Sequence, residues 1–325
     1  MTRIYNGCWQ LSPGHSEATI DREAVLRGWE RMVDAGLDVF DVADIYVGVE
    51  ELLGELAKRR SIRVHTKCVP DRSLLPKLTR ADLEATIDRS LQRLGIERLD
   101  RVQFHWWDFE VDGWIEAYGW LDAMRQAGKI DELALTNFDL AHMKQLIDAG
   151  LPVRSLQVQY SLLDRRPAGA LSDYCQQHQI GLLAYGALAG GLFGPAWLGV
   201  EQPDADQVNR SLVKYLLIVE ECGGWEAFQN RLATIQSIAE AHEASIGSVA
   251  TRWVLEQPAV EAVIVGARND RWLEENLKTL ALRLSRDELK QLDEGAFVQG
   301  EIYDLERERD GRHASIMRYD LNRQP

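Results

Sequence analysis

The chain has 325 residues, a formal net charge of −14 and a pI near 5.0. The length suits one α/β barrel, and the acidic balance argues against a nucleic-acid partner, which would need clustered lysines and arginines. No apolar run approaches the roughly 20 residues that cross a bilayer. Four scattered cysteines, without a CxxC pair or a secretory leader, indicate free thiols. We therefore expect a cytoplasmic protein without membrane or nucleic-acid partners.

Apolar, β-prone segments alternate with segments of helical spacing along the chain. Residues 4–11 are the first predicted strand, and residues 21–36 are a helix with Val25, Trp29 and Met32 along one stripe. A strand at 37–42 and a helix at 50–59 follow. The same order continues with strands 62–68, 100–106, 129–136, 155–160, 180–185 and 260–266, and with helices 79–95, 113–128, 140–149, 169–178 and 272–279.

One connection in this pattern is longer than the others. Residues 186–243 form an insertion that begins with a glycine-rich loop and contains helices near 212–222 and 225–243. A helix at 247–255 leads to the last strand, and another opens at residue 285. Eight strand and helix signals without a composition break predict a (β/α)8 TIM barrel over residues 1–296, followed by a polar tail at 297–325.

Polar residues stand where the predicted strands end. These residues are Asp41, Lys67, His105, Asn137, Gln157 and Tyr185. Each one alone also has an ordinary structural interpretation, such as a helix cap, a solvated lysine or a core histidine. In a (β/α)8 barrel, however, the carboxyl ends of all eight strands meet at one face, where the active site lies. The pattern therefore predicts one polar site at the barrel mouth.

Four residues near that mouth fit proton transfer to or from a carbonyl oxygen. A tyrosine phenol, here Tyr46, has a pKa of about 10 and donates its proton poorly at neutral pH. An ammonium such as Lys67 makes the phenolate easier to form, and a buried carboxylate such as Asp41 keeps that ammonium charged. His105 is then placed to orient a carbonyl oxygen. No metal-binding spacing accompanies these residues.

The residues around this group resemble the aldo-keto reductase family. Residues 40–46 and 50–54 are similar to its Asp and Tyr signature, Lys67 ends the next predicted strand, and residues 103–106 resemble its His strand. The resemblance extends from about residue 4 to residue 284. It implies reduction of an aldehyde or ketone, or oxidation of the alcohol, by direct hydride transfer, with Asp41, Tyr46, Lys67 and His105 as the catalytic tetrad and Tyr46 as the general acid or base.

The same resemblance implies an NADP(H) cofactor, with NAD less favoured. It assigns Thr136, Asn137 and Gln157 to the nicotinamide carboxamide and Tyr185 to the nicotinamide ring. The glycine-rich loop, with Gly186, Leu188, Gly190 and Leu192, corresponds to the pyrophosphate segment. The resemblance assigns the contacts to the adenosine end of the cofactor to Gly266, Arg268, Trp272, Glu275 and Asn276. Arg268 is the expected 2′-phosphate ligand, whereas Trp272 departs from the Gln or Arg of many relatives and offers an indole for stacking.

The sequence also indicates substrate walls and leaves alternatives open. Trp9, Trp106 and Trp107 are expected around a small carbonyl or alcohol substrate, since indoles pack flat apolar surfaces. One alternative is a nucleotide-sensing regulatory subunit with little turnover. Another is a barrel lyase that uses Lys67 as a Schiff base. The particular carbonyl, the physiological direction, self-association and the role of the tail stay open at this stage.

Overall fold

The computed structural model describes residues 2–12 and 20–302. Within them, eight parallel strands pair in chain order and close into a barrel. The strands are β1 (Ile4–Gly7), β2 (Val39–Asp41), β3 (Arg63–Cys68), β4 (Leu99–Phe104), β5 (Ile130–Thr136), β6 (Ser155–Gln159), β7 (Gly181–Tyr185) and β8 (Val260–Gly266). This closed order confirms the predicted (β/α)8 architecture.

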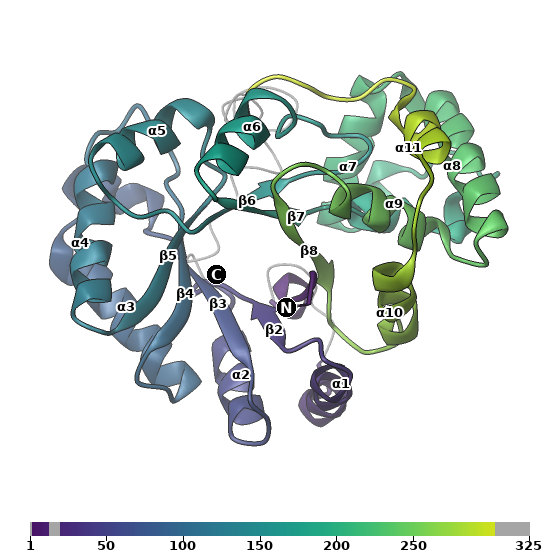
Figure 1. Ribbon diagram of the computed structural model, residues 1–325. Coiled ribbons are helices and arrows are strands. Elements are labelled where there is room, and N and C mark those ends of the chain that lie inside the picture. Colours follow the sequence, from purple (N-terminus) through teal and green to yellow (C-terminus); the bar gives the residue numbers. More distant parts are fainter. Residues whose placement is uncertain (1, 13–19, 303–325) are drawn as a thin grey trace.

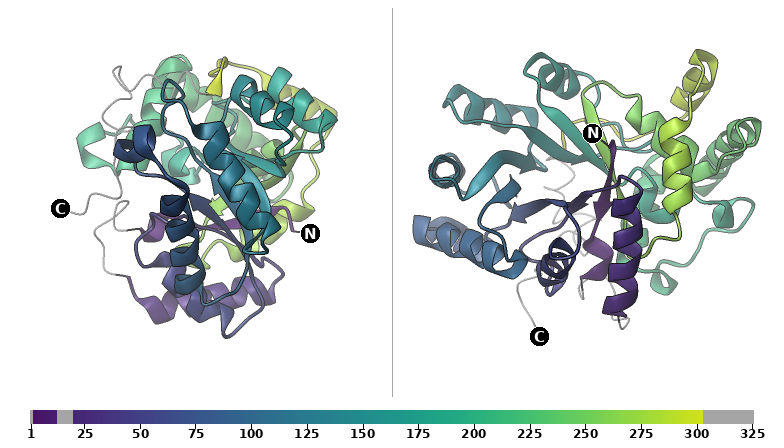
Figure 2. Two further views of the ribbon diagram at one scale, coloured as in Figure 1. Left: turned by 90° about the vertical axis from the view of Figure 1, so that its left-hand side faces the viewer. Right: turned by 60° about the horizontal axis from the view of Figure 1, so that its bottom comes forward.

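Helices surround the strands (Figures 1 and 2). They are α1 (Arg22–Asp34), α2 (Val49–Ala57), α3 (Arg80–Leu94), α4 (Trp114–Gln126), α5 (Leu140–Asp148), α6 (Ala170–Gln177), α7 (Arg210–Glu221), α8 (Gly224–Ala241), α9 (Ile246–Leu255), α10 (Leu273–Ala281) and α11 (Arg286–Asp293). Short 3-10 turns are η1 (Trp9–Leu11), η2 (Arg72–Lys77), η3 (Ala189–Gly191), η4 (Pro195–Trp197) and η5 (Ala205–Gln207). Helices α7 and α8 lie within the predicted insertion, on the side of the barrel where α9 and α11 lie (Figure 1).

Local sequence signals explain several boundaries. Thr79 and Asp82 form a reciprocal capping box at the start of α3, and Gly95 ends that helix in the left-handed conformation. The predicted first strand was too long. Its final residues turn into η1, because the Leu11 N–H bonds to the Cys8 carbonyl at 3.0 Å instead of extending the sheet.

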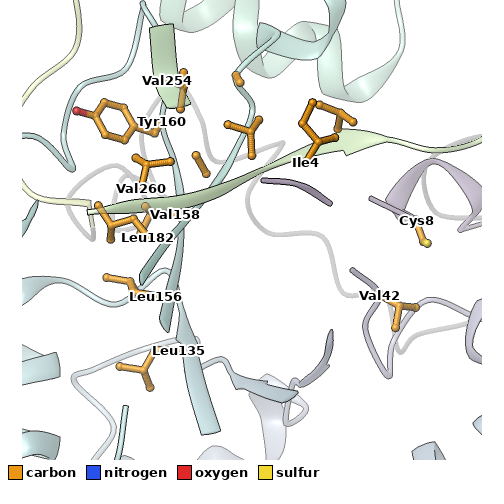
Figure 3. Close-up of a cluster of buried hydrophobic side chains, with 14 of the residues drawn as sticks. Ile4, Cys8, Val42, Leu135, Leu156, Val158, Tyr160, Leu182, Val254 and Val260 are labelled. Carbon is orange, nitrogen blue, oxygen red and sulfur yellow. The ribbon is translucent and has the colours of Figure 1, made fainter. Parts of the chain in front are cut away.

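The main apolar core lies between the strands and the helices. Figure 3 shows part of it, with Leu156, Val158 and Leu182 carried by the neighbouring strands β6 and β7. Trp29 of α1 is fully buried in this core, and its indole N–H donates to the Ala267 carbonyl at 2.8 Å. Truncation of such a tryptophan typically costs about 3–5 kcal/mol of stability. The contact fixes α1 beside the loop that carries the predicted adenosine site.

The predicted tail is described only over its first residues. The Val298 N–H donates to the Leu163 carbonyl at 2.8 Å, and the Arg165 N–H donates to the Val298 carbonyl at 2.8 Å. Arg166 Nη1 donates to the Ile302 carbonyl at 2.8 Å. Residues 297–302 are therefore fixed to the segment that follows β6. Residues 303–325 lie outside the described part of the chain.

Candidate active site

A buried ion pair between neighbouring strands lies at the centre of the predicted tetrad. Lys67 Nζ donates to Asp41 Oδ2 at 2.8 Å and to the Val42 carbonyl oxygen at 2.8 Å. Asp41 is 5% exposed and Lys67 is 7% exposed. Both lie at the carboxyl ends of their strands, β2 and β3, which pair in parallel. Each charge needs the other, because removing one partner of a buried pair leaves an uncompensated buried charge.

Two glutamine amides complete the surroundings of Asp41. Gln103 Nε2 donates to Asp41 Oδ1 at 2.8 Å, and Gln157 Nε2 donates to the same oxygen at 2.7 Å. The amino group of Gln157, expected at a nicotinamide carboxamide, thus lies against Asp41 inside the barrel. The sequence prediction gave Gln103 no role. Strand alternation was the available signal, because Gln103 lies two residues before His105 and shares its side of β4.

The phenol of Tyr46 lies above this pair, in the loop after β2. Its ring centroid is 5.1 Å from that of Trp9 and 5.4 Å from Lys67 Nζ. Burial raises the pKa of Tyr46 well above its usual 10.0, and the negative charge of Asp41 adds to this effect. We expected the Lys67 ammonium to favour the phenolate. Desolvation of the phenol is the largest cause of the raised pKa. The phenol therefore keeps its proton at neutral pH.

Local hydrogen bonds hold the Tyr46 loop. The Tyr46 N–H donates to the Ala43 carbonyl at 2.9 Å, which closes a turn. Gly48 has a φ of 77°, in the left-handed region that glycine adopts without strain, and leads directly into α2. Asp44 Oδ1 accepts from the Val69 N–H at 3.2 Å and so joins this loop to the segment after β3. The loop is thereby fixed relative to Lys67.

His105 follows directly after β4. Its backbone N–H donates to the Cys68 carbonyl at 3.1 Å, which places it beside the end of β3. Its ring centroid is 4.4 Å from that of Trp107. The Trp107 indole N–H donates to the Pro70 carbonyl at 2.7 Å and so anchors this ring pair. The imidazole of His105 thus packs against the Trp107 ring at the mouth.

Trp106 does not lie where the sequence prediction put it. It is only 2% exposed, its ring packs 5.8 Å from that of Phe104, and its indole N–H donates to the Asp108 carbonyl at 2.9 Å. The residue belongs to the core outside the barrel, because neighbouring strand residues point to opposite sides. Trp9 and Trp107, which contact Tyr46 and His105, remain as predicted walls of the substrate pocket.

The predicted nicotinamide contacts gather at the ends of β5 and β7. Thr136 is buried as the last residue of β5, and Asn137 follows with a φ of 57°. Asparagine tolerates this left-handed conformation better than most residues. Tyr185 Oη donates to Asn137 Oδ1 at 3.0 Å. From α7, Lys214 Nζ lies 5.4 Å from the centroid of the Tyr185 ring.

The glycine-rich loop after β7 packs closely under α7. A Cβ atom on Gly186 would lie 2.4 Å from Tyr215 Oη, and one on Gly190 would lie 2.7 Å from the Tyr215 ring. Both glycines also have positive φ, at 75° and 66°. Leu192 is buried. The side chain of Leu188 lies against Gly247 of α9, where an added Cβ atom would be 3.3 Å from Leu188 Cδ2. Glycine is therefore required for this loop to pass between α7 and the barrel.

The predicted adenosine contacts lie around the start of α10. Arg268 is half-buried, and its guanidinium makes no hydrogen bond or ion pair with any residue that the structure describes. Trp272 is 48% exposed, and the Arg271 guanidinium lies 4.7 Å from its ring. Glu275 accepts from Ser248 Oγ at 3.3 Å.

Two more predicted contacts flank these residues. Gly266 ends β8 with its backbone exposed, and a Cβ there would lie 2.9 Å from Gln10 Oε1. Asn276 lies in the first turn of α10 and is half-buried. The predicted cofactor contacts thus form a row that begins at Tyr185, passes Leu188 and the start of α9, and ends at α10. This arrangement suits an elongated ligand.

No helix over residues 2–12 and 20–302 is both long and apolar enough to cross a membrane. Over the same residues, histidine, cysteine and carboxylate side chains form no group of three or more that could hold a metal ion.

Residues 3–296 match the sequence profile of the Aldo/keto reductase family. The chain belongs to this family. Its family is one of oxidoreductases, and its eight-stranded barrel is an aldo/keto reductase barrel.

Relatives with named activities cover most of the chain. It is 28% identical over 308 residues to an L-glyceraldehyde 3-phosphate reductase of Escherichia coli O157:H7, an alignment that covers 89% of this chain and 87% of the relative. It is 24% identical over 312 residues to the NADH-specific methylglyoxal reductase of Escherichia coli strain K12, with 88% and 91% covered. An aldo-keto reductase from Klebsiella pneumoniae, solved with NADPH, has a similar fold, with a TM-score of 0.68, 24% identity and coverage of 90% and 89%.

Proposed function

We propose that this aldo/keto reductase reduces a small aldehyde or ketone with NADP(H). The observation that carries the proposal is the phenol of Tyr46 beside the buried pair of Lys67 and Asp41, with His105 at the end of the next strand. When bound, the nicotinamide cofactor supplies the hydride. The chain's own residues supply the proton and the geometry.

The roles of the four residues follow from their surroundings. Tyr46 holds a proton at Oη and donates it to the carbonyl oxygen, a general acid step worth about 10²–10⁴-fold in rate. Lys67 stabilises the charge that develops on the phenolic oxygen, and Asp41 keeps Lys67 protonated. His105 orients the carbonyl oxygen, with its ring held by Trp107. In the oxidation direction the same phenolate accepts the proton.

The residues of the cofactor face fit a dinucleotide. Asn137 and Tyr185 offer amide and aromatic groups at the mouth, and the loop from Gly186 to Leu192 allows close approach of a diphosphate. Arg268 offers a guanidinium that no described residue engages, which favours a phosphorylated ribose. We therefore propose NADPH over NADH. The substrate is proposed to be a small carbonyl compound, in line with the aldehyde and the ketoaldehyde in the names of the two bacterial relatives.

A Schiff-base lyase is disfavoured by the contacts of Lys67. Its ammonium donates both to Asp41 and to a backbone carbonyl. A charged amine with both contacts is not a nucleophile. A regulatory subunit that binds the cofactor without turnover is the alternative that the following experiment separates.

The test is a titration with NADPH and with NADH, followed by tryptophan quenching, and then an assay of NADPH oxidation with small aldehydes. We expect tighter binding of NADPH, and we expect Arg268→Ala to weaken NADPH much more than NADH. Tyr46→Phe should abolish turnover while binding is retained. Binding without turnover by the unsubstituted protein would favour the regulatory alternative, and no binding of either nucleotide would refute the proposal.

A further inference from the structure

We propose that Gln103 is a positioning residue for this reaction, which sets the orientation of Asp41 so that one carboxylate oxygen is kept for Lys67. The inference rests on the proposed function for its catalytic consequence. Its geometric part concerns only the buried contacts among four side chains at the carboxyl ends of β2, β3, β4 and β6.

The two carboxylate oxygens of Asp41 have different hydrogen-bond partners. Asp41 Oδ2 accepts only from Lys67 among the described residues, whereas Oδ1 accepts from Gln103 and Gln157. Gln103 is fully buried, at 0% exposed. It pairs with Lys67 in the register of β3 and β4, so both side chains enter the barrel at the same level. The amide thus reaches Asp41 across the intervening strand β3.

A second hydrogen bond fixes which end of the Gln103 amide faces Asp41. Its Oε1 accepts from Gln157 Nε2 at 2.7 Å, so its Nε2 is left to donate to Asp41. The opposite orientation would place two acceptors, Oε1 and Oδ1, against each other and leave the Gln157 donor facing an amino group. Both losses would leave buried polar groups unsatisfied, which disfavours this orientation.

The charges around Asp41 make this arrangement relevant to Tyr46. The groups that interact with the Asp41 carboxylate are Lys67 from β3, Tyr46 from the loop after β2, Cys8 from the end of β1 and the two amides. Without the Gln103 donor, only Gln157 still holds Asp41 Oδ1, so the carboxylate rotates more easily towards sharing both oxygens with Lys67. The Lys67 ammonium would then move relative to the Tyr46 phenol, whose developing charge it stabilises in the proposed reaction.

Two substitutions of Gln103 separate positioning from simple packing. Gln103→Met keeps the length of the side chain but removes the donor. Gln103→Glu keeps the shape, and a protonated glutamic acid can donate to Asp41, whereas an ionised one repels it. The matched control is Gln236→Glu, because Gln236 Nε2 donates to the Glu240 carboxylate at 2.7 Å on the exposed face of α8.

The primary measurement is kcat/KM for an aldehyde from about pH 6 to about pH 9. For Gln103→Met we expect a loss of roughly tenfold to a hundredfold that is constant with pH, as for removal of a hydrogen bond to a charged group. For Gln103→Glu the ratio to the unsubstituted protein should fall by at least about tenfold as pH rises, because the introduced carboxyl loses its proton. Gln236→Glu should match the unsubstituted protein throughout. A flat ratio for Gln103→Glu, or full activity of Gln103→Met, would overturn the proposal.

A second measurement does not depend on turnover. The coupling free energy between Asp41 and Lys67 is obtained from urea unfolding of Asp41→Asn, Lys67→Met and the double variant, with and without Gln103→Met. We expect the coupling to fall by at least about twofold when Gln103 is replaced, and an unchanged coupling would refute the positioning role. If the protein does not reduce carbonyls at all, the proposed function fails, whereas this measurement still decides the role of Gln103.

Discussion

Asp44 gives the protein a pH-dependent stability that one substitution should remove. Burial raises the pKa of Asp44 from 3.8 to about 8, and the nearby Glu50 adds to the shift, while Arg89, the Val69 N–H and Arg93 oppose it. Between these two pH values the unfolded chain has released the proton and the folded chain still holds it. Stability is therefore fully present below about pH 4 and is lost as pH rises towards 8.

The magnitude follows from the two pKa values. Each pH unit in this window costs about 1.4 kcal/mol, so the loss is about 4 kcal/mol between pH 5 and pH 8. Asp44→Asn has no proton to release, and its side-chain oxygen still accepts from the Val69 N–H. Asp44 also lines a surface cavity of about 480 Å³. Water that enters this cavity would hydrate an ionised carboxylate, so the 4 kcal/mol is an upper bound.

The assay is urea unfolding followed by tryptophan fluorescence, at four values from about pH 5 to about pH 8. The unfolding free energy of Asp44→Asn, relative to the unsubstituted protein, should increase at every step. Asp112→Asn serves as the control, because Asp112 is exposed and should show a constant difference. A constant difference for Asp44→Asn as well would mean that this carboxyl is ionised in the folded protein, and would refute the reasoning.

Two further predictions concern the ion pair and the glycine-rich loop. Lys67→Met should lower the unfolding free energy by about 3–5 kcal/mol, because the Asp41 carboxylate is left buried and unpaired. Adding Asp41→Asn should restore much of that stability in urea unfolding but no carbonyl reduction, and a fully stable single variant would contradict the prediction. Gly186→Ala should weaken NADPH binding by roughly tenfold or more, because its Cβ would meet Tyr215 Oη at 2.4 Å where φ is 75°. Tyr215→Phe added to Gly186→Ala should recover part of the affinity by tryptophan quenching, and unchanged binding of Gly186→Ala alone would show that the loop shifts without cost.

The fold was predictable because its signals are local. Each strand is a mostly apolar run of a few residues, and several helices carry their own caps, such as Thr79 with Asp82 at the start of α3. The errors are local too. Residues 8–11 are as apolar as a strand, but the chain turns there once Cys8 has bonded to the Asp41 carbonyl at the edge of the barrel. Alternation would also have placed Trp106 opposite His105, outside the barrel.

The site was predictable only in part, since its decisive contacts join distant strands. Asp41 and Lys67 end successive strands, so their pairing follows from the barrel order. Gln103 and Gln157 reach Asp41 from strands that do not neighbour β2, and that reach depends on the register and closure of all eight strands. The raised pKa of Tyr46 has the same origin. It depends on how deeply the phenol is buried and on which charges face it, and neither quantity can be read from the chain.

The apolar core and the polar network around Asp41 lie in different parts of the barrel. The apolar contacts that stabilise the barrel lie between strands and helices, where Trp29 and Leu182 are fully buried. The interior at the carboxyl end instead holds a charged pair and two amides, although a buried ion pair is often no more stabilising than well-packed apolar residues. Such a network fixes one arrangement of its members, because any other arrangement leaves a buried donor or acceptor unmet. The carboxyl end of the barrel interior thus holds a charge in one position beside Tyr46, while most of the apolar packing lies in the layer outside.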